Sequence, residues 1–177
     1  MNRRMGLLSI MLFATACGPE SAADETNKET SASELKTSVS QLVDPPVVTF
    51  WEGNGCSQDQ VGWYIYNNTP MIMPNSGGSG WVNDEARSMM LFRMPANTIV
   101  RVYNSGSGSH SEDWAEIVVK EYADQLCIHS FEDAVDNAAY SLRYCRYNGD
   151  LDGKVSQARI QGYPFNGDTC NGTWMPW

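Results

Sequence analysis

The feature that most constrains the fold is a series of short runs of β-branched and aromatic residues, separated by clusters of Gly, Asn, Asp and Ser. Short runs with turn residues between them predict the strands of an all-β sandwich. Alternation supports this prediction, because Ala115, Ile117 and Val119 share one face of a strand. Outside the first segment, helical turns are expected only at 133–139 and, transiently, at 33–42. The predicted strands are 47–51, 61–67, 88–92, 99–103, 115–122, 126–131, 140–147 and 155–160.

The first segment, residues 1–16, has the pattern of a bacterial secretory signal. Arg3 and Arg4 precede an uncharged apolar run that is too short to span a bilayer, since a spanning helix needs about 20 apolar residues. The run ends in small residues before Cys17 and resembles the lipobox of bacterial lipoproteins. This resemblance implies cleavage before Cys17 and acylation of its thiol. Ordinary secretion, with cleavage after Ala16, is the alternative.

Residues 17–45 are rich in Ser, Thr, Ala and Glu and contain no aromatic residue. Such a segment cannot bury enough apolar surface to offset its ordering entropy, so we predict a disordered acidic tether. The Pro45-Pro46 pair marks the start of the folded domain, 46–177. An acylated Cys17 would make the lipid bilayer a partner and place the domain at the outer membrane or cell surface of a Gram-negative bacterium.

Acidic residues outnumber basic ones by 21 to 12, which gives a net charge of −9. Nucleic-acid binding depends on clustered Lys and Arg, so we do not expect nucleic acid as a partner. The sequence has no Gly-x-Ser-x-Gly elbow, and its two histidines are His110 and His129. His110, with Asp113 nearby, lies in a Ser/Gly-rich stretch predicted to be a flexible exposed loop, and His129 is predicted at a strand rim. We therefore predict a protein that is not an enzyme.

The chain has five cysteines, an odd number. If Cys17 is acylated, four remain, and an even number in an exported chain predicts two disulfides with three possible pairings. Cys127 and Cys145 fall on predicted neighbouring strands. This favours a bridge between them and leaves Cys56 to pair with Cys170, while the other two pairings stay open.

Two segments resemble the βγ-crystallin motif, in which Asn/Asp-Asn/Asp-x-x-Ser/Thr-Ser precedes an apolar strand. The first is Asn83-Asp84-Glu85-Ala86-Arg87-Ser88, and the second, weaker copy is 151–156. The resemblance implies a Greek-key β-sandwich built from two units that open at 48–53 and 100–106. Neither opening has the aromatic residue and the glycine that the family places after its first aromatic position.

The family resemblance also implies calcium, held by residues such as Asn83 and Asp84. The fifth motif position, which supplies a hydroxyl in the family, is Arg87 in one copy and Val155 in the other. Two alternatives stay open: Arg87 pairs with Asp84 or Glu85 as an internal counter-ion, or both motifs only stabilise turns.

A second loop offers oxygen ligands for calcium. Asn148, Asp150 and Asp152 occupy the first, third and fifth positions of an EF-hand-like loop, whose twelfth position is Arg159 instead of Glu. Because strands are predicted on both sides, an EF-hand is not expected. A carboxylate-rich loop with weak calcium affinity is expected instead.

Trp174 and Trp177 lie near the chain end, where little core is available, and are candidates for stacking against a ligand. Trp63, Tyr64 and Tyr66 are expected in the core instead. Together these features favour an exported, anchored, non-enzymatic βγ-crystallin-like structural or binding domain with weak or vestigial calcium binding. The alternative is a carbohydrate- or protein-binding surface module, including protease-inhibitor-like use of the fold. A hydrolase using His110 ranks last.

Overall fold

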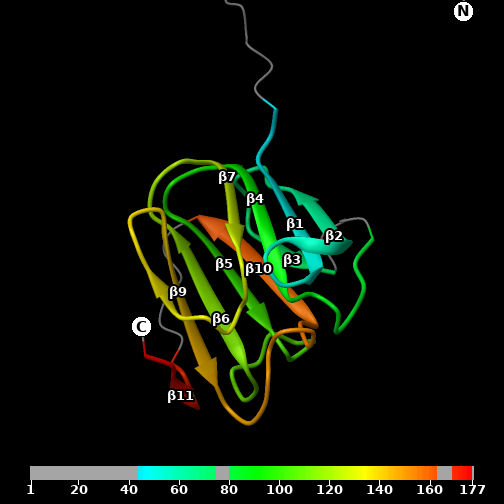
Figure 1. Cartoon of the computed structure of the whole chain (residues 1–177), viewed down its shortest axis with the longest axis vertical. Coiled ribbons are helices and arrows are strands. Elements are labelled where there is room, and N and C mark those ends of the chain that lie inside the picture. The colour runs from blue at the N-terminus through cyan, green and yellow to red at the C-terminus, as the bar shows by residue number, and fades with distance from the viewer. Residues whose placement is uncertain (1–43, 75–79, 163–168, 177) are drawn as a thin grey trace, which may run out of the picture. The chain divides into compact units, whose positions relative to one another are not determined.

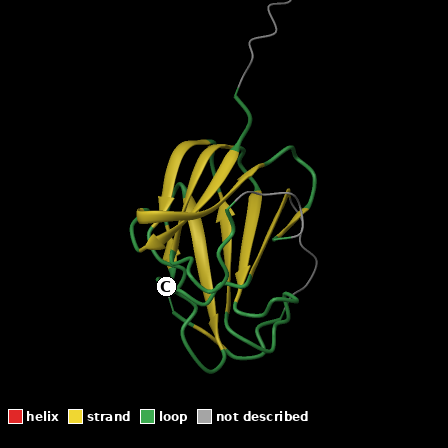
Figure 2. Cartoon of the chain, turned by 90° about the vertical axis from the view of Figure 1, so that its right-hand side faces the viewer, coloured by secondary structure: helices red, strands yellow, loops and turns green. Residues whose placement is uncertain are grey.

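The computed structural model describes residues 44–74, 80–162 and 169–176, and within these ranges it contains strands and no helix. The strands form two antiparallel sheets that pack as two layers (Figures 1 and 2). In the described part of the chain, no helix is long and apolar enough to cross a membrane. The predicted signal, Cys17, nearly all of the predicted tether and Trp177 lie outside the described residues.

The first sheet has four strands in the spatial order β2-β1-β4-β7. The second has seven, in the order β11-β9-β6-β5-β10-β3, with β8 pairing beside β9. The strands of the first sheet are β1 (Val47–Gly53), β2 (Ser57–Ile65), β4 (Ser88–Met94) and β7 (Ala123–Ile128). Those of the second are β3 (Met71–Met73), β5 (Thr98–Tyr103), β6 (Trp114–Val119), β8 (Val135–Asp136), β9 (Tyr140–Arg146), β10 (Gln157–Gly162) and β11 (Thr173–Trp174).

All eight predicted strands coincide at least in part with a strand of the structure, so the all-β sandwich is confirmed. The predicted strand 115–122 runs too far, because β6 ends at Val119 and the chain crosses to the other sheet as β7. The helical turn expected at 133–139 is wrong. This segment forms β8 and a turn in which the Asn137 side chain accepts hydrogen bonds from the backbone N–H groups of Ala139 and Tyr140.

The core lies between the sheets and is filled by alternate residues of the facing strands. Phe50 of β1 meets Trp81 edge-on, with ring centres 5.3 Å apart, and also meets Phe131 at 6.5 Å. Tyr64 and Tyr66 are buried, as expected, whereas Trp63 on the same segment is 37% exposed. Burial of such large side chains is the main favourable term for folding a domain of this size.

Each half of the chain sends one strand into the other half's sheet. Strands β1, β2 and β4 belong to the four-stranded sheet, whereas β3 pairs with β10 in the seven-stranded one. In the second half, β5, β6 and β10 share a sheet, whereas β7 pairs with β4. The orders β2-β1-β4-β7 and β6-β5-β10-β3 are therefore equivalent, and neither half of the chain completes a sheet alone.

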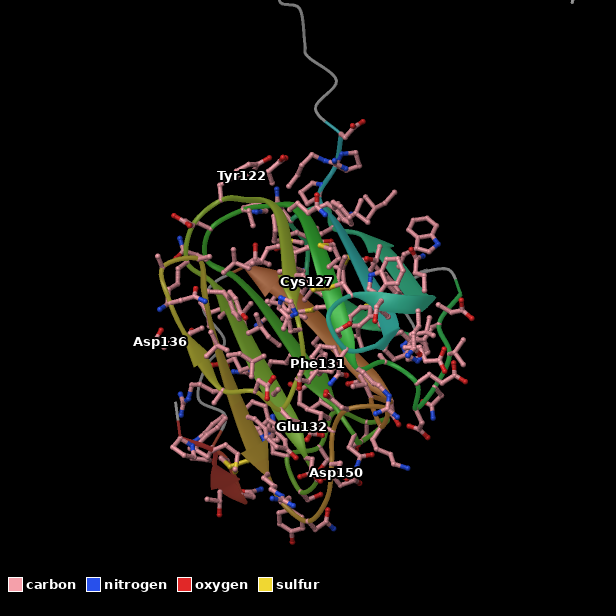
Figure 3. The ribbon with its side chains drawn as sticks, viewed as in Figure 1. Tyr122, Cys127, Phe131, Glu132, Asp136 and Asp150 are labelled. Atoms are coloured by element: carbon pink, nitrogen blue, oxygen red, sulfur yellow. A yellow bond between two sulfur atoms is a disulfide. The ribbon has the colours of Figure 1, made fainter. Side chains whose placement is uncertain are left out.

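The cysteines form two disulfides, Cys56–Cys127 and Cys145–Cys170. The favoured pairing of Cys127 with Cys145 is wrong. Cys127 lies on β7 of the four-stranded sheet (Figure 3), whereas Cys145 lies on β9 of the other sheet. Although β7 and β9 are close in the sequence, the chain crosses to the four-stranded sheet to form β7, so the two strands lie in different sheets.

The two bridges are expected to differ in their effect on stability. Their sequence separations are 71 and 25 residues. Chain-entropy arguments assign about 4.4 kcal/mol to the longer loop and about 3.5 kcal/mol to the shorter one, as upper values. Replacing Cys56 and Cys127 by Ala is expected to lower the free energy of unfolding in urea more than the same change at Cys145 and Cys170. In a proteolytic digest of the protein made without reduction, recovery of a peptide in which Cys127 is joined to Cys145 would contradict this connectivity.

Candidate functional site

The two motif copies lie at one end of the sandwich and contact each other. One precedes β4 and the other precedes β10. The backbone N–H of Asp84 donates to the Val155 carbonyl at 3.2 Å, and that of Gly153 donates to the Ala86 carbonyl at 2.9 Å. The Ser156 hydroxyl donates to the Asp84 carboxylate at 2.7 Å. The copies therefore brace one another, which sequence spacing alone did not predict.

Ser88, the last residue of the first motif copy, ties that copy to the β1–β2 turn. It is fully buried, and its hydroxyl donates to the Gly53 carbonyl at 2.6 Å and accepts from the Cys56 N–H at 2.9 Å. A Cβ on Gly53 would lie 2.5 Å from the Ser57 hydroxyl oxygen, so a larger residue does not fit without a shift. These contacts give Ser88 a structural role.

Arg87 lies across the second motif copy. A Cβ on Gly153, whose φ is 75°, would lie 2.8 Å from a guanidinium nitrogen of Arg87. The ion pair expected with Asp84 or Glu85 is not formed among the described residues. The positive charge instead stands over the glycine of the opposite copy.

One further loop at this end, around Phe131, exchanges hydrogen bonds with the second motif copy through carboxylates. Asp152 accepts from the Phe131 N–H at 2.9 Å and from the Ser130 hydroxyl at 2.7 Å. Glu132 accepts from the N–H groups of Leu151 and Asp152 at 2.6 and 2.8 Å. Each acid thus satisfies backbone or hydroxyl donors of the opposite loop; Phe131, Glu132 and Asp150 are labelled in Figure 3.

The residues predicted to bind calcium do not converge. Asn83, Asp84, Asn148 and Asp150 are exposed, and both carboxylate oxygens of Asp152 already accept protein hydrogen bonds. Within the described ranges, no group of three or more His, Cys, Asp or Glu side chains is placed to hold a metal ion.

Asp152 titrates unusually high for an aspartate. Burial raises its pKa to about 6, and the nearby Glu132 adds to that rise. Hydrogen bonds from Ser130, Phe131 and Asn54 act in the opposite direction and are outweighed. The Asp152 carboxylate, which links the two loops, therefore changes its protonation state near pH 6.

This pKa predicts a pH dependence of stability. A folded-state pKa above the ordinary 3.8 contributes stability that is fully present below that value and is lost as the pH rises through about 6. We expect a loss of roughly 1 kcal/mol after allowance for solvent screening. Asp152→Asn is expected to remove this component from urea unfolding measured between about pH 3 and pH 7, a range that covers both the ordinary pKa and the raised one. The control is Asp150→Asn, in the same loop and exposed, and an equal effect of both changes would refute the assignment.

The outer face of the seven-stranded sheet carries a second group of functional side chains. Strand register places two adjacent rows across it. The basic row, from β10 to β9, is Arg159, Arg101, Glu116 and Arg143. The aromatic row, from β10 to β11, is Gln157, Tyr103, Trp114, Cys145 and Trp174.

Each arginine of the basic row lies over a ring of the aromatic row. The distances from guanidinium carbon to ring centre are 3.9 Å for Arg143 and Trp174, 5.5 Å for Arg101 and Trp114, and 5.0 Å for Arg159 and Tyr103. Such contacts attract a cation to the ring face, more strongly where water is excluded. The rows therefore form three cation–π pairs, whose arginines lie on three different strands.

The three arginines differ in their other partners. Arg101 is 2% exposed and donates twice to one Glu116 oxygen, at 2.8 and 2.5 Å. Arg159 donates to the Gln157 side chain and to the Ser107 carbonyl. Within the described part of the chain, neither Arg143 nor Arg159 has a carboxylate partner, and Arg143 is exposed.

The Ser/Gly-rich loop that carries His110 joins β5 to β6 and packs onto this face: Gly106, Ser107 and Ser111 are exposed, as expected, whereas His110 is half-buried. Gly108, with φ of 68°, lies against Arg159 and Gln157 so closely that no Cβ would fit. The His110 ring centre is 4.6 Å from that of Trp114. Burial, together with the positive charges of Arg101 and Arg159, lowers the pKa of His110.

Asp113, the acid named with His110 in the hydrolase hypothesis, serves other partners. It is fully buried and accepts from the Tyr147 N–H at 2.8 Å and from the Tyr144 hydroxyl at 3.2 Å. Burial and the Asp113 charge raise the pKa of Tyr144. This arrangement ties β9 to the end of the loop before β6. His129, the residue that follows β7, is exposed, and its carbonyl accepts from the Gly55 N–H.

Trp174 is half-buried in the aromatic row. Its ring meets Trp114 edge-on at 5.0 Å, and the Cys145–Cys170 disulfide fixes the segment that precedes it. The small Cys145 side chain lies between the two tryptophans in the strand register. One signal for this face was visible in the sequence, because Arg101-x-Tyr103 and Trp114-x-Glu116 have the two-residue spacing that places side chains on one face of a strand.

No protein-family model matches this chain, and neither does any curated protein or solved structure. The family assignment therefore depends on the chain's own residues and strand order. A functional hypothesis can use two surfaces. They are the end of the sandwich where the two motif copies meet and the outer face of the seven-stranded sheet.

Proposed function

We propose that this protein is an exported, lipid-anchored, non-enzymatic binding module with a βγ-crystallin-like double Greek-key domain. The observation that carries the proposal is the equivalent strand exchange in the two halves. In a Greek key the fourth strand returns to lie beside the first. Here β4 pairs with β1 and β10 pairs with β5, and both of these returning strands follow a motif copy.

The loop end is held by protein groups in place of a metal ion. Arg87 stands against Gly153, Ser156 bonds to Asp84, and the exchange between Asp152 and Glu132 joins the neighbouring loops. The carboxylates of Asp84 and Asp152, two of the predicted calcium ligands, thus already accept hydrogen bonds from within the chain. In this proposal calcium binding is vestigial, and the domain folds fully without it.

Thermal melting tests the metal-independent brace. A ligand that binds only the native state raises stability by mass action. We expect superimposable melting curves in EGTA and in about 10 mM Ca²⁺, a concentration about ten times the dissociation constant of the weakest extracellular calcium sites. A rise of several degrees with Ca²⁺ would contradict the proposal.

Arg87→Ser sharpens this test because it removes the guanidinium and restores the hydroxyl of the fifth motif position. The variant is expected to melt lower than the parent in EGTA and to regain stability with Ca²⁺. Arg146→Ser, an exposed arginine on β9, is the matched control. If Ca²⁺ leaves the Arg87→Ser curve unchanged, Arg87 does not stand in for the ion.

The proposed lipid anchor requires that the chain is exported and that the Cys17 thiol is acylated. Two disulfides support an oxidising compartment, since disulfides persist mainly outside the cytoplasm. In cells fed labelled palmitate, the full chain is expected to incorporate label and to fractionate with membranes. Cys17→Ser is expected to lose both properties, because one acyl-accepting thiol is removed while the signal remains. Equal labelling of the two proteins would refute the anchor.

A further inference from the structure

We propose that the free edge of β2 pairs with the same edge of a second copy of this chain, so that the domain forms a weak dimer with two-fold symmetry. Strand β2 ends the four-stranded sheet and lies at the side of the domain, on the right in Figure 1. This interaction surface involves neither the lipid anchor nor the calcium motifs, so the experiments on those two features do not bear on it.

The backbone of β2 has unpaired hydrogen-bonding groups on the side that faces away from β1. The Tyr66 N–H donates to the carbonyl of Pro46, which precedes β1, at 2.8 Å. Because the direction of the hydrogen bonds alternates along an antiparallel strand, the N–H and C=O groups of Trp63 and Ile65 point to the opposite side. Within the described ranges no hydrogen bond reaches these groups. Such an edge is a template for a further strand.

Strand β2 lacks the features that normally protect an edge strand from pairing. Proteins keep edge strands short, or place charged residues and Pro on them. Strand β2 has nine residues, and its second half, 61–65, contains no charged residue and no Pro. The other edge of the same sheet, β7, carries the exposed Asp124, and the outermost strands of the second sheet, β3 and β11, have three and two residues. Among the described strands, β2 is therefore the edge most suited to pairing.

Exposed apolar side chains are concentrated at this edge. Among the described residues, six large apolar side chains are more than a third exposed. Two of them belong to β2, where Trp63 and Ile65 are 37% and 46% exposed. A third is Val82, whose N–H donates to the Val61 carbonyl of β2 at 2.9 Å. Exposed apolar groups that lie together, unlike scattered ones, mark an interaction site.

A single register satisfies both the backbone groups and the side chains. When two antiparallel copies of β2 are related by a two-fold axis beside Tyr64, Trp63 of each copy lies opposite Ile65 of the other copy. Opposed residues of this type exchange both of their N–H···O=C hydrogen bonds, so every free group of Trp63 and Ile65 gains a partner. The two opposed side chains then lie beside each other on one face, as an aromatic and β-branched cross-strand pair.

Val82 excludes the neighbouring register. Its N–H already occupies the Val61 carbonyl, so an axis at Trp63, which would place Ile65 opposite Val61, leaves Ile65 without an acceptor. An axis at Ile65 would place Trp63 opposite a residue beyond the end of β2. The pairing is therefore confined to Trp63 and Ile65, and the small number of contacts makes the dimer weak.

The choice of a second copy over a foreign strand follows from charge and self-complementarity. The net charge of −9 opposes the close approach of two copies over most of the surface. The stretch 61–67 has no charged residue, so this repulsion is least at the free part of β2. A basic partner strand would find no acidic side chain in this stretch, whereas Trp63 and Ile65 cover each other. An isologous contact of this kind closes after two copies.

Sedimentation equilibrium of the oxidised mature chain tests the association, with Cys17→Ser so that no lipid contributes. We expect a weight-average mass that rises from that of a monomer toward that of a dimer between about 10 µM and 1 mM, as suits a small interface. A chain that remains a monomer at about 1 mM overturns the proposal.

Hydrogen exchange of the same protein locates the contact without any change in β2. The backbone N–H groups of Trp63 and Ile65 are expected to exchange more slowly at the concentration where the dimer forms than at a tenfold lower one, because they become hydrogen-bonded. If the dimer forms while exchange at these two positions stays unchanged, the copies associate through another surface and the proposal is overturned.

A variant pair separates edge pairing from a general effect of charge. Ile65→Lys places a charge on the edge and removes the side chain that covers Trp63, so it is expected to weaken the dimer at least tenfold. Tyr122→Lys makes the same change in charge at a residue that is 59% exposed in the loop between β6 and β7, and it is expected to associate like the parent. Melting curves check that both variants fold. Equal association constants for the two variants would overturn the proposal.

Discussion

The exchange of β3 and β7 between the two sheets is the constraint on which the rest of this structure depends. Each sheet contains an edge strand contributed by the other half of the chain. Because these contacts join residues far apart in the sequence, neither half can bury its apolar face alone. The two motif copies meet at one end of the sandwich as part of the same arrangement.

At that end of the sandwich, partly buried carboxylates accept hydrogen bonds from other groups of the protein. Asp152 and Glu132 neutralise no cation and instead satisfy backbone and hydroxyl donors across two loops. Withdrawal from water raises the pKa of Asp152 to about 6, and the charge of the nearby Glu132 makes a smaller contribution in the same direction. Arg87 places a positive charge where the βγ-crystallin motif that this segment resembles has a hydroxyl, and metal-independent packing of these loops is part of our proposal.

Sequence periodicity was sufficient to predict the strands and the sandwich, because inward and outward residues alternate clearly in β6 and β9. It missed β3, β8 and β11, which have only two or three residues and show no period. The disulfide pairing could not be predicted, since it depends on which sheet β7 joins. Composition misplaced His110 and Trp174, because Ser/Gly content and proximity to a chain end do not say what a segment packs against.

The outer face of the seven-stranded sheet was the least predictable part of the structure. Its residues come from five strands, and their rows become visible only when the strand register is known. The cation–π pairs order the outer side of the seven-stranded sheet, on which Tyr103 and Trp114 are buried although no helix covers them in the described part of the chain. Fold and proposed function thus depend on the same strand pairing.

Equilibrium unfolding in urea, followed by tryptophan fluorescence and far-ultraviolet circular dichroism on the oxidised chain, tests this interdependence most directly. Trp51, Trp63 and Trp81 report on the first half of the chain, and Trp114 and Trp174 on the second. The strand exchange predicts one cooperative transition with coincident curves from both probes. Two separated transitions, with one half losing structure while the other stays folded, would contradict it.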